Sequence, residues 1–421
     1  MLQIKEKKDC CGCEACIQRC PQQCIAVRED SEGFLYPVVD EGRCTDCGLC
    51  ERVCPGLQPG EPREPLKVYA AKNPDEKVRI QSSSGGIFSL LAEQVIRAGG
   101  VVFGARFDGR WEVVLDYTEA MEGLEAFRGS KYVQSRTGET YRQAETFLRA
   151  GRKVLFCGTP CQIAGLKLFL RKEYENLLTV DFICHGVPSP GVWRKYLQEI
   201  AARRAAGKNT VLSASLNTSD DISQNISSIS FRDKALGWKK FSFVVRLSAT
   251  DGAEKNSVLL SECFSKNLFM RGFLTNLYLR PSCYACPAKS FRSGSDMTIG
   301  DFWGVECVLP DFDDDKGISG VMLNTRKAEV LWKSIPVDCK SVLYPQLYRA
   351  NPALEMSAKE SGNRKLFVWK EGQLLLPLIE RLTRESRWKK LKAGSRFCLR
   401  VFLQKTGLFH TVISIIRKCK I

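Results

Sequence analysis

CCGCEACIQRCP (residues 10–21) and CTDCGLCERVCP (residues 44–55) share one cysteine spacing, in which each run ends in a Cys-Pro pair. The spaced cysteines are Cys10, Cys13, Cys16 and Cys20 in the first run, and Cys44, Cys47, Cys50 and Cys54 in the second. The chain of 421 residues contains 20 cysteines, and ten of these lie within the first 54 positions. This concentration predicts two neighbouring sites with thiolate ligands in a small N-terminal module.

The doubled spacing is typical of bacterial ferredoxins with two [4Fe–4S] clusters. Three thiolates spaced by two residues bind three corners of one iron–sulfur cube, whereas the fourth, before the proline, turns away and completes the other cube. The assigned sets are Cys10, Cys13, Cys16 and Cys54 for one cluster, and Cys20, Cys44, Cys47 and Cys50 for the other. Two zinc sites are the alternative, although zinc sites rarely repeat this four-cysteine spacing.

The length of 421 residues leaves room for two or three domains, and a hydrophobic fraction of 44% is ordinary for a globular protein. No apolar stretch precedes the first cysteine run, so we expect no signal peptide. We expect no transmembrane helix either, because the longest nearly uncharged apolar stretch, Gly407 to Ile416, is too short. So many free thiols need a reducing compartment, which predicts a cytoplasmic protein. A disulfide framework is the alternative, and the expected lack of a signal peptide argues against it.

The net charge of +16 is concentrated at one end of the chain. Residues 387–421 contain ten Lys or Arg and no Asp or Glu, so the remainder is only mildly basic. Such a tail, without regularly spaced aromatic residues, argues against a nucleic-acid partner. Apolar and basic residues mix around Arg396 to Lys405, which suggests peripheral contact with an anionic membrane surface. A basic helical tail packed on its own domain is the alternative.

Hydrophobic patterning beyond the cysteine runs predicts an α/β protein (α+β overall), with a ferredoxin-like module, a mixed-sheet domain and a helical C-terminal appendage. The expected parts are a module (1–57), a linker (58–66), an N-terminal region (67–150), a C-terminal region (151–350) and the helical basic appendage (351–421). The expected strands are 68–71, 101–107, 111–117, 153–156, 178–183, 229–232 and 241–247, the expected helices are 87–98 and 139–149, and a polar loop or insertion is expected at 205–228.

A second group of cysteines follows the strands of the predicted sheet. The strand ending at Phe156 leads into Cys157, and Thr159 with Pro160 predicts the start of a helix that carries Cys161 in its first turn. The dipole of that helix is expected to lower the pKa of the Cys161 thiol. The next strand leads into Cys184, after which Ser189 and Pro190 predict the cap and first turn of another helix. Parallel pairing would bring these cysteines to the carboxyl edge of the sheet, where open α/β sheets bind ligands.

A Cys-x2-Cys pair lies in a later proline-bounded loop and suggests a third cluster. The proposed ligands are Cys161, Cys184, Cys283 and Cys286, with Cys157 and Cys263 in reserve. Buried, unreactive cysteines are the alternative for any one of these positions.

Five stretches then resemble the coenzyme F-420 hydrogenase/dehydrogenase beta-subunit family over roughly residues 67–330. They are SSSGGIFS (82–89), GSKYVQS (129–135), FCGTPCQIAGL (156–166), DFICHGVPSP (181–190) and YLRPSCYACPAKSF with SDMTIGDFWG (278–304). The resemblance implies a flavoprotein that binds FAD with a [4Fe–4S] cluster beside the flavin, so the mixed-sheet domain is expected to be a flavin/Fe–S domain. Because the family also includes reductases of other substrates and relatives in polysaccharide synthesis, it leaves the substrate open.

Candidate cofactor-binding residues occupy these stretches. They are Ser82, Ser83, Ser84, Gly85, Gly86, Lys131, Gly158 and Thr159. The Ser-Gly turn would offer backbone N–H groups to the FAD pyrophosphate, whereas simple helix capping is the alternative. Lys131 would pair with phosphate or reduced flavin unless it is a solvated surface lysine. His185 is the candidate catalytic proton donor, and a structural hydrogen bond is its alternative.

These features together predict an FAD- and [4Fe–4S]-dependent oxidoreductase. It would pass electrons between its ferredoxin-type clusters and FAD, and reduce or oxidise an organic or deazaflavin-type substrate. The expected partner is a ferredoxin or another electron donor. The alternative is a non-catalytic electron-transfer subunit of a larger redox complex, and the oligomeric state stays open.

Overall fold

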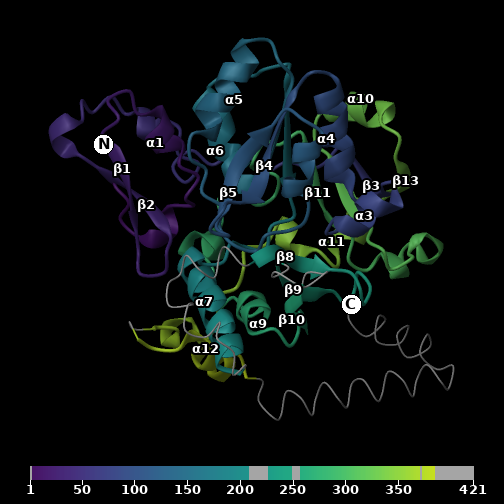
Figure 1. Ribbon diagram of the computed structural model, residues 1–421. Helices are drawn as coiled ribbons and strands as arrows, with labels where there is room; N and C mark the ends of the chain where they lie inside the picture. The colour runs from purple at the N-terminus through teal and green to yellow at the C-terminus, as the bar shows by residue number, and fades with distance from the viewer. Residues whose placement is uncertain (1, 208–225, 249–256, 370–371, 385–421) are drawn as a thin grey trace, which may run out of the picture.

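The computed structural model describes residues 2–207, 226–248, 257–369 and 372–384 (Figure 1). Most of the expected insertion at 205–228 and the basic tail at 387–421 lie outside these residues. Where the expected insertion begins, helix α7 (Pro190–Gly207) continues to residue 207, and strand β8 begins at Ile226. In the described part of the chain, no helix is long and apolar enough to cross a membrane.

One mixed sheet of eight strands organises the fold and confirms the α/β class. In spatial order the strands are β13 (Asp338–Val342), β3 (Lys67–Lys72), β12 (Ser319–Leu323), β11 (Met297–Asp301), β7 (Leu177–Phe182), β6 (Val154–Gly158), β4 (Val101–Phe107) and β5 (Val113–Thr118). The central strands β11, β7, β6 and β4 pair in parallel, and the outer pairs are antiparallel. Since the sheet takes strands from both sides of residue 150, the regions 67–150 and 151–350 share one structural unit.

Helices cover both faces of this sheet. On one face, α4 (Ile87–Arg97) and α10 (Arg326–Ser334) share an apolar core with the sheet. On the other face, α5 (Thr140–Arg149) and α6 (Pro160–Leu170) do so. Strands β6 and β7 are buried almost throughout, because both of their sides face helices. This arrangement leaves the carboxyl ends of β6 and β7 as the place for a ligand.

Local sequence signals proved reliable where a side chain closes a turn. The hairpin between β4 and β5 forms at Asp108, whose Oδ1 accepts the backbone N–H groups of Arg110 and Glu112, each at 2.9 Å. Thr159 caps α6, and Ser189 Oγ accepts the N–H of Val192 at the start of α7. Both capping predictions are therefore confirmed.

A smaller antiparallel sheet, β10-β9-β8, lies beside the large one. Its strands are β8 (Ile226–Asp233), β9 (Ser242–Leu247) and β10 (Ser257–Cys263), and it shares an apolar core with α7, α9 (Leu268–Leu274) and α12 (Leu375–Thr383). Glu199 on α7 accepts the backbone N–H groups of Leu375 and Leu376. The described part of the expected appendage is thus packed into this core. Shorter helices are α3 (Glu76–Gln81) and α11 (Tyr344–Tyr348).

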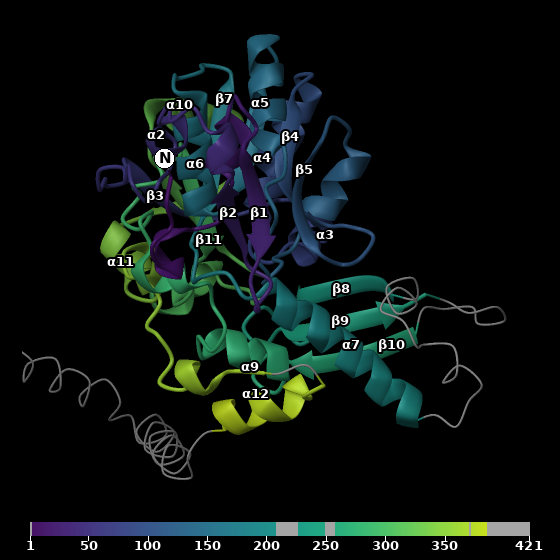
Figure 2. The same ribbon diagram turned by 90° about the vertical axis from the view of Figure 1, so that its left-hand side faces the viewer.

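The N-terminal module packs on the face of the large sheet that carries α5 and α6 (Figures 1 and 2). It consists of α1 (Ala15–Arg19), the hairpin β1 (Ile25–Glu29) and β2 (Leu35–Val39), and α2 (Leu49–Arg52). The Glu14 carboxylate accepts the N–H groups of Thr137 and Gly138, each at 3.0 Å. Gln18 Oε1 accepts the N–H of Tyr141 at 3.0 Å, so α1 supplies partners for the N-terminal N–H groups of α5.

Replacement of Gly165 by alanine tests how closely the module docks. A Cβ at Gly165 on α6 would lie 2.9 Å from Cys13 Sγ and 3.0 Å from Cys13 Cβ. Overpacking of this kind lowers the free energy of unfolding by about 1–3 kcal/mol. This loss exceeds the roughly 0.5–1 kcal/mol of stability that alanine gains over glycine within a helix. We expect the melting temperature of Gly165→Ala to fall. Gly362→Ala, where a Cβ meets nothing within 4 Å, is the control. Equal melting temperatures would contradict this contact.

Candidate functional site

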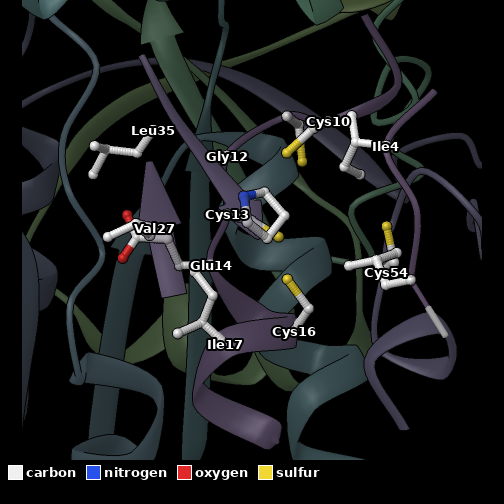
Figure 3. Close-up of a pocket in the computed structure, with 13 residues that line it drawn as sticks. Ile4, Cys10, Gly12, Cys13, Glu14, Cys16, Ile17, Val27, Leu35 and Cys54 are labelled. Atoms are coloured by element: carbon white, nitrogen blue, oxygen red, sulfur yellow. The ribbon is translucent and has the colours of Figure 1, made fainter. Parts of the chain in front are cut away.

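Two pockets in the N-terminal module are lined by two separate groups of cysteines. The first contains Cys10, Cys13, Cys16 and Cys54, together with Cys11. Figure 3 shows these four spaced cysteines around one space, with Cys54 reaching it from the second run. The second pocket contains Cys20, Cys44, Cys47 and Cys50, together with Cys24. Each pocket thus offers four thiols from both runs, a donor set that suits a [4Fe–4S] cluster.

The two pockets differ in their exposure. Cys13 and Cys16 are buried where the module meets α6, whereas Cys47 is exposed and Cys44 is half-buried. The first pocket is therefore the inner one, and the second lies nearer the solvent.

Cys11 links the inner pocket to the sheet domain. Hydrogen bonding to Cys11 and burial raise the pKa of the Cys161 thiol well above its usual value. Cys11 also interacts with Cys13, whose side chain lines the inner pocket. The expectation that the dipole of α6 lowers the pKa of Cys161 is wrong, because the hydrogen bond and burial outweigh the dipole.

A cavity of about 620 Å³ opens at the carboxyl edge of β6 and β7, a volume that suits a dinucleotide-sized cofactor. Its walls come from the start of α4, the segment 128–135, the β6–α6 turn, the segment 182–188 and the small sheet. Of the sequence-predicted residues, the cavity is lined by Ser82, Ser83, Ser84, Gly86, Lys131, Cys157, Gly158, Thr159, Cys161, Cys184 and His185. The fold thus brings the family-like stretches together around one space.

The Ser82–Gly86 turn is held by its own side chains. Ser82 Oγ donates to the carbonyl of Val78 at 2.7 Å, and Ser84 Oγ donates to that of Ile318 at 2.9 Å. Gly85 does not line the cavity but permits a close approach, because a Cβ there would lie 2.4 Å from the carbonyl oxygen of Ala71. With the hydroxyls engaged, the backbone at the start of α4 is the part of this turn suited to an anion.

Two basic side chains face the same region of the cavity. Lys131 Nζ donates to the carbonyls of Arg128 and Gly129 at 3.0 and 3.2 Å, and among the described residues it forms no salt bridge. Burial lowers the pKa of Lys131 to about 7. Arg128 bonds Ser89 on α4 and also lines the cavity. The cations and the helix N-terminus together fit an anionic ligand group such as a pyrophosphate.

At the β6–α6 turn, Gly158 and Thr159 are positioned by reciprocal capping. Gln162 Oε1 accepts the N–H of Thr159 at 3.0 Å, while the Thr159 hydroxyl accepts the N–H of Gln162. This leaves the main chain of the turn fixed at the wall of the cavity.

His185 lies in the cavity wall with one ring nitrogen engaged. Its Nε2 lies 2.5 Å from Asn276 Oδ1, and burial lowers the pKa of the imidazole. The Asn276 side chain is itself fixed by the carbonyl of Lys359 at 2.7 Å. The ring is therefore oriented, and it is predominantly neutral at neutral pH.

The cysteines of the suggested third cluster belong to the first turn of α6 and to two adjoining loops. Burial, with smaller contributions from Cys161 and Cys286, raises the pKa of Cys184 to about 12 against the lowering effect of Lys289. Cys283 Sγ accepts the N–H of Val187 at 3.4 Å, which joins the two loops. Of the reserve positions, Cys157 lines the cavity, and Cys263 lies on β10 with its thiol 3.5 Å from Ser265.

Sequence reasoning missed the residues that join the module to the cavity. Arg280, Gln134 and Cys11 contact one another across this junction, and Arg128 contributes to the cavity wall. Arg280 and Gln134 lie inside the quoted stretches 278–304 and 129–135, but their partners are 123 or more residues away in the chain. No local signal could have predicted these contacts.

Comparisons with known proteins match the N-terminal module and a part of the sheet domain separately. Residues 9–56 match the model of the 4Fe-4S dicluster domain, and residues 151–340 match that of the C terminus of the coenzyme F420 hydrogenase/dehydrogenase beta subunit. A chain of the xenon-derivatised F420-reducing [NiFe] hydrogenase complex from Methanosarcina barkeri is 15% identical. The match covers 69% of this chain and 89% of that chain, with a TM-score of 0.43. No curated protein matches this chain.

The two matched segments together support an iron–sulfur redox protein with electron-transfer function. Residues 9–56 therefore belong to the 4Fe-4S dicluster domain family, and residues 151–340 belong to the C-terminal domain family of the coenzyme F420 hydrogenase/dehydrogenase beta subunit.

Proposed function

We propose that the chain is an FAD- and [4Fe–4S]-dependent oxidoreductase acting on an organic or deazaflavin-type substrate. The observation that carries the proposal is the junction at Cys11, a residue that lines the inner cysteine pocket and whose carbonyl oxygen accepts a hydrogen bond at 3.1 Å from Gln134 Nε2 in the wall of the 620 Å³ cavity. Bound clusters would supply one-electron transfer, and a bound flavin would couple it to two-electron exchange. The cavity favours catalysis by this chain over a purely electron-carrying role.

The thiols of the two pockets are the proposed cluster ligands. Cys10, Cys13, Cys16 and Cys54 would hold the inner cluster, and Cys20, Cys44, Cys47 and Cys50 the outer one. The exposure of Cys47 suits the outer pocket to an encounter with a redox partner protein. Cys161, Cys184, Cys283 and Cys286 remain the proposed ligands of a third cluster.

The residues of the cavity would bind the flavin and the substrate. The start of α4, Arg128 and Lys131 would hold the anionic part of FAD, while Gly158 and Thr159 would supply a fixed main-chain wall. His185 would accept a proton at Nδ1 and return it from there, because Nε2 donates to Asn276 Oδ1.

The experiment that tests the function uses anaerobically purified, reduced full-length protein. Addition of the true substrate should reoxidise the reduced flavin in stoichiometric amount, which is followed by the flavin absorbance. A redox partner protein is added to a separate sample as the comparison. If no tested organic or deazaflavin substrate accepts electrons while a partner protein does, the chain is the electron-transfer subunit of a complex.

Iron counts in paired variants test the ligand sets. Cys54→Ser and Cys10→Ser should each remove about four irons, and the double variant should remove no more, because both residues serve one cluster. Cys54→Ser with Cys47→Ser should remove about eight irons, because these residues serve different clusters. Additive loss in the first pair, or zinc in place of iron, would contradict the assignment. In the same series, Cys283→Ser tests the third site, with the exposed Cys307→Ser as its control.

The pKa of Lys131 predicts how FAD affinity depends on pH. A bound anion stabilises the charged ammonium, so binding should be strongest below pH 7 and weaken by up to about tenfold per pH unit above it. Lys131→Met should weaken binding at pH 6 and flatten the dependence, as measured by FAD fluorescence titration between pH 6 and 8. The exposed Lys77→Met is the control. A pH dependence that persists unchanged in Lys131→Met would exclude this role.

A further inference from the structure

Arg280 is fully buried at the junction between the module and the sheet domain, with 0% of its surface exposed. Its Nε donates to the carbonyl of Cys10 at 2.7 Å, and its Nη2 lies 3.4 Å from Cys10 Sγ. Nη2 also donates to the carbonyl of Leu35 at 2.9 Å, and Nη1 to Gln134 Oε1 at 2.9 Å. The guanidinium is therefore fixed against one of the thiols that line the inner pocket.

The charge of Arg280 lacks the partner that the other buried arginines have. Arg79 pairs with Asp314, and Arg232 pairs with Asp301 at 2.7 Å. Among the residues that the structure describes, no carboxylate forms a salt bridge with Arg280. A buried guanidinium without a counter-charge is costly. Neutral carbonyls and the rings of Tyr36 and Phe34 offset this only in part. The anionic group that its Nη2 meets is the thiolate of Cys10 once a cluster binds.

The outer pocket offers an instructive contrast. Arg52 donates to the carbonyl of Cys47 at 2.7 Å, but this bond is exposed and does not involve a sulfur atom. Solvent and salt screen a charge at such a position, whereas a buried charge is screened much less. The two pockets thus differ in the positive charge that their thiolates experience.

We propose that Arg280 is a positioning and redox-tuning residue that raises the reduction potential of the inner cluster above that of the outer one. This inference rests on the proposed function, because it requires the cluster held by Cys10, Cys13, Cys16 and Cys54. Reduction adds one electron and thus one negative charge to the cluster, and the fixed cation with its N–H···S contact favours that state. An electron that a redox partner protein delivered to the outer cluster would then be stabilised on the inner cluster, next to the cavity.

The main chain of Arg280 extends the same role toward the cavity. Its N–H donates to the carbonyl of Val187, and its carbonyl accepts the N–H of Cys283, each at 2.9 Å. One residue therefore holds Cys10 through its side chain and the loop of Cys283 through its backbone.

The test is a redox titration of anaerobic full-length variants, monitored by EPR, with iron and sulfide counts on each. Arg280→Gln should keep its iron and shift the inner midpoint potential to more negative values, leaving the outer one unchanged. Arg280→Lys should shift it less, because lysine keeps the charge but loses the planar fork. The signal of the inner cluster is identified by its absence in Cys54→Ser.

Arg52→Gln is the matched control and should leave the inner potential unchanged. An inner potential equal to wild type in both Arg280 variants overturns the proposal. If Arg280→Gln does not retain the inner cluster, the inner midpoint potential of Arg280→Lys is compared with that of the wild type instead, and an unchanged value overturns the proposal. Wild-type protein that binds no iron after reconstitution would instead refute the proposed function.

Discussion

The docking of the first cysteine run onto α5 and α6 is the contact on which the rest of the site depends. It is apolar at its centre, where Cys13 meets Gly165. It is polar at its edge, where Glu14 bonds the N–H groups of Thr137 and Gly138 just before α5 and Gln18 bonds that of Tyr141 in its first turn. Because interiors are close-packed, this contact allows little relative movement. It fixes Cys11 beside Cys161 and thereby sets how the inner pocket faces the cavity.

Arrangements that rest on short stretches of sequence were predicted well. The cysteine spacing anticipated which thiols line each pocket, although their role as ligands stays a prediction. The caps at Thr159 and Ser189 were correct because each involves partners three residues apart. The order of the sheet could not be predicted, since β3 lies between β12 and β13, which come more than 240 residues later. For the same reason the sequence did not indicate the role of Arg280. It also predicted a lowered pKa for Cys161, whereas Cys11, from another part of the chain, raises that pKa.

The family-like stretches contribute different features to the cavity wall. The hydroxyls of Ser82 and Ser84 bond the protein itself, so the serines shape the turn. Positive charge comes from Lys131 and Arg128 on a neighbouring segment. Separating shape from charge lets the backbone approach a ligand closely while side chains on another segment supply the positive charge.

The bonds from Glu14 and Gln18 to α5 also have a consequence for biosynthesis. The acceptors leave the ribosome more than a hundred residues before the N–H groups of Thr137, Gly138 and Tyr141 that they will meet. Contacts this distant in the chain form late, after the loop-closure entropy has been overcome. The nascent module therefore remains without its docking surface while its thiols are already accessible, which opens an early interval for metal insertion before the sheet domain closes over the inner pocket.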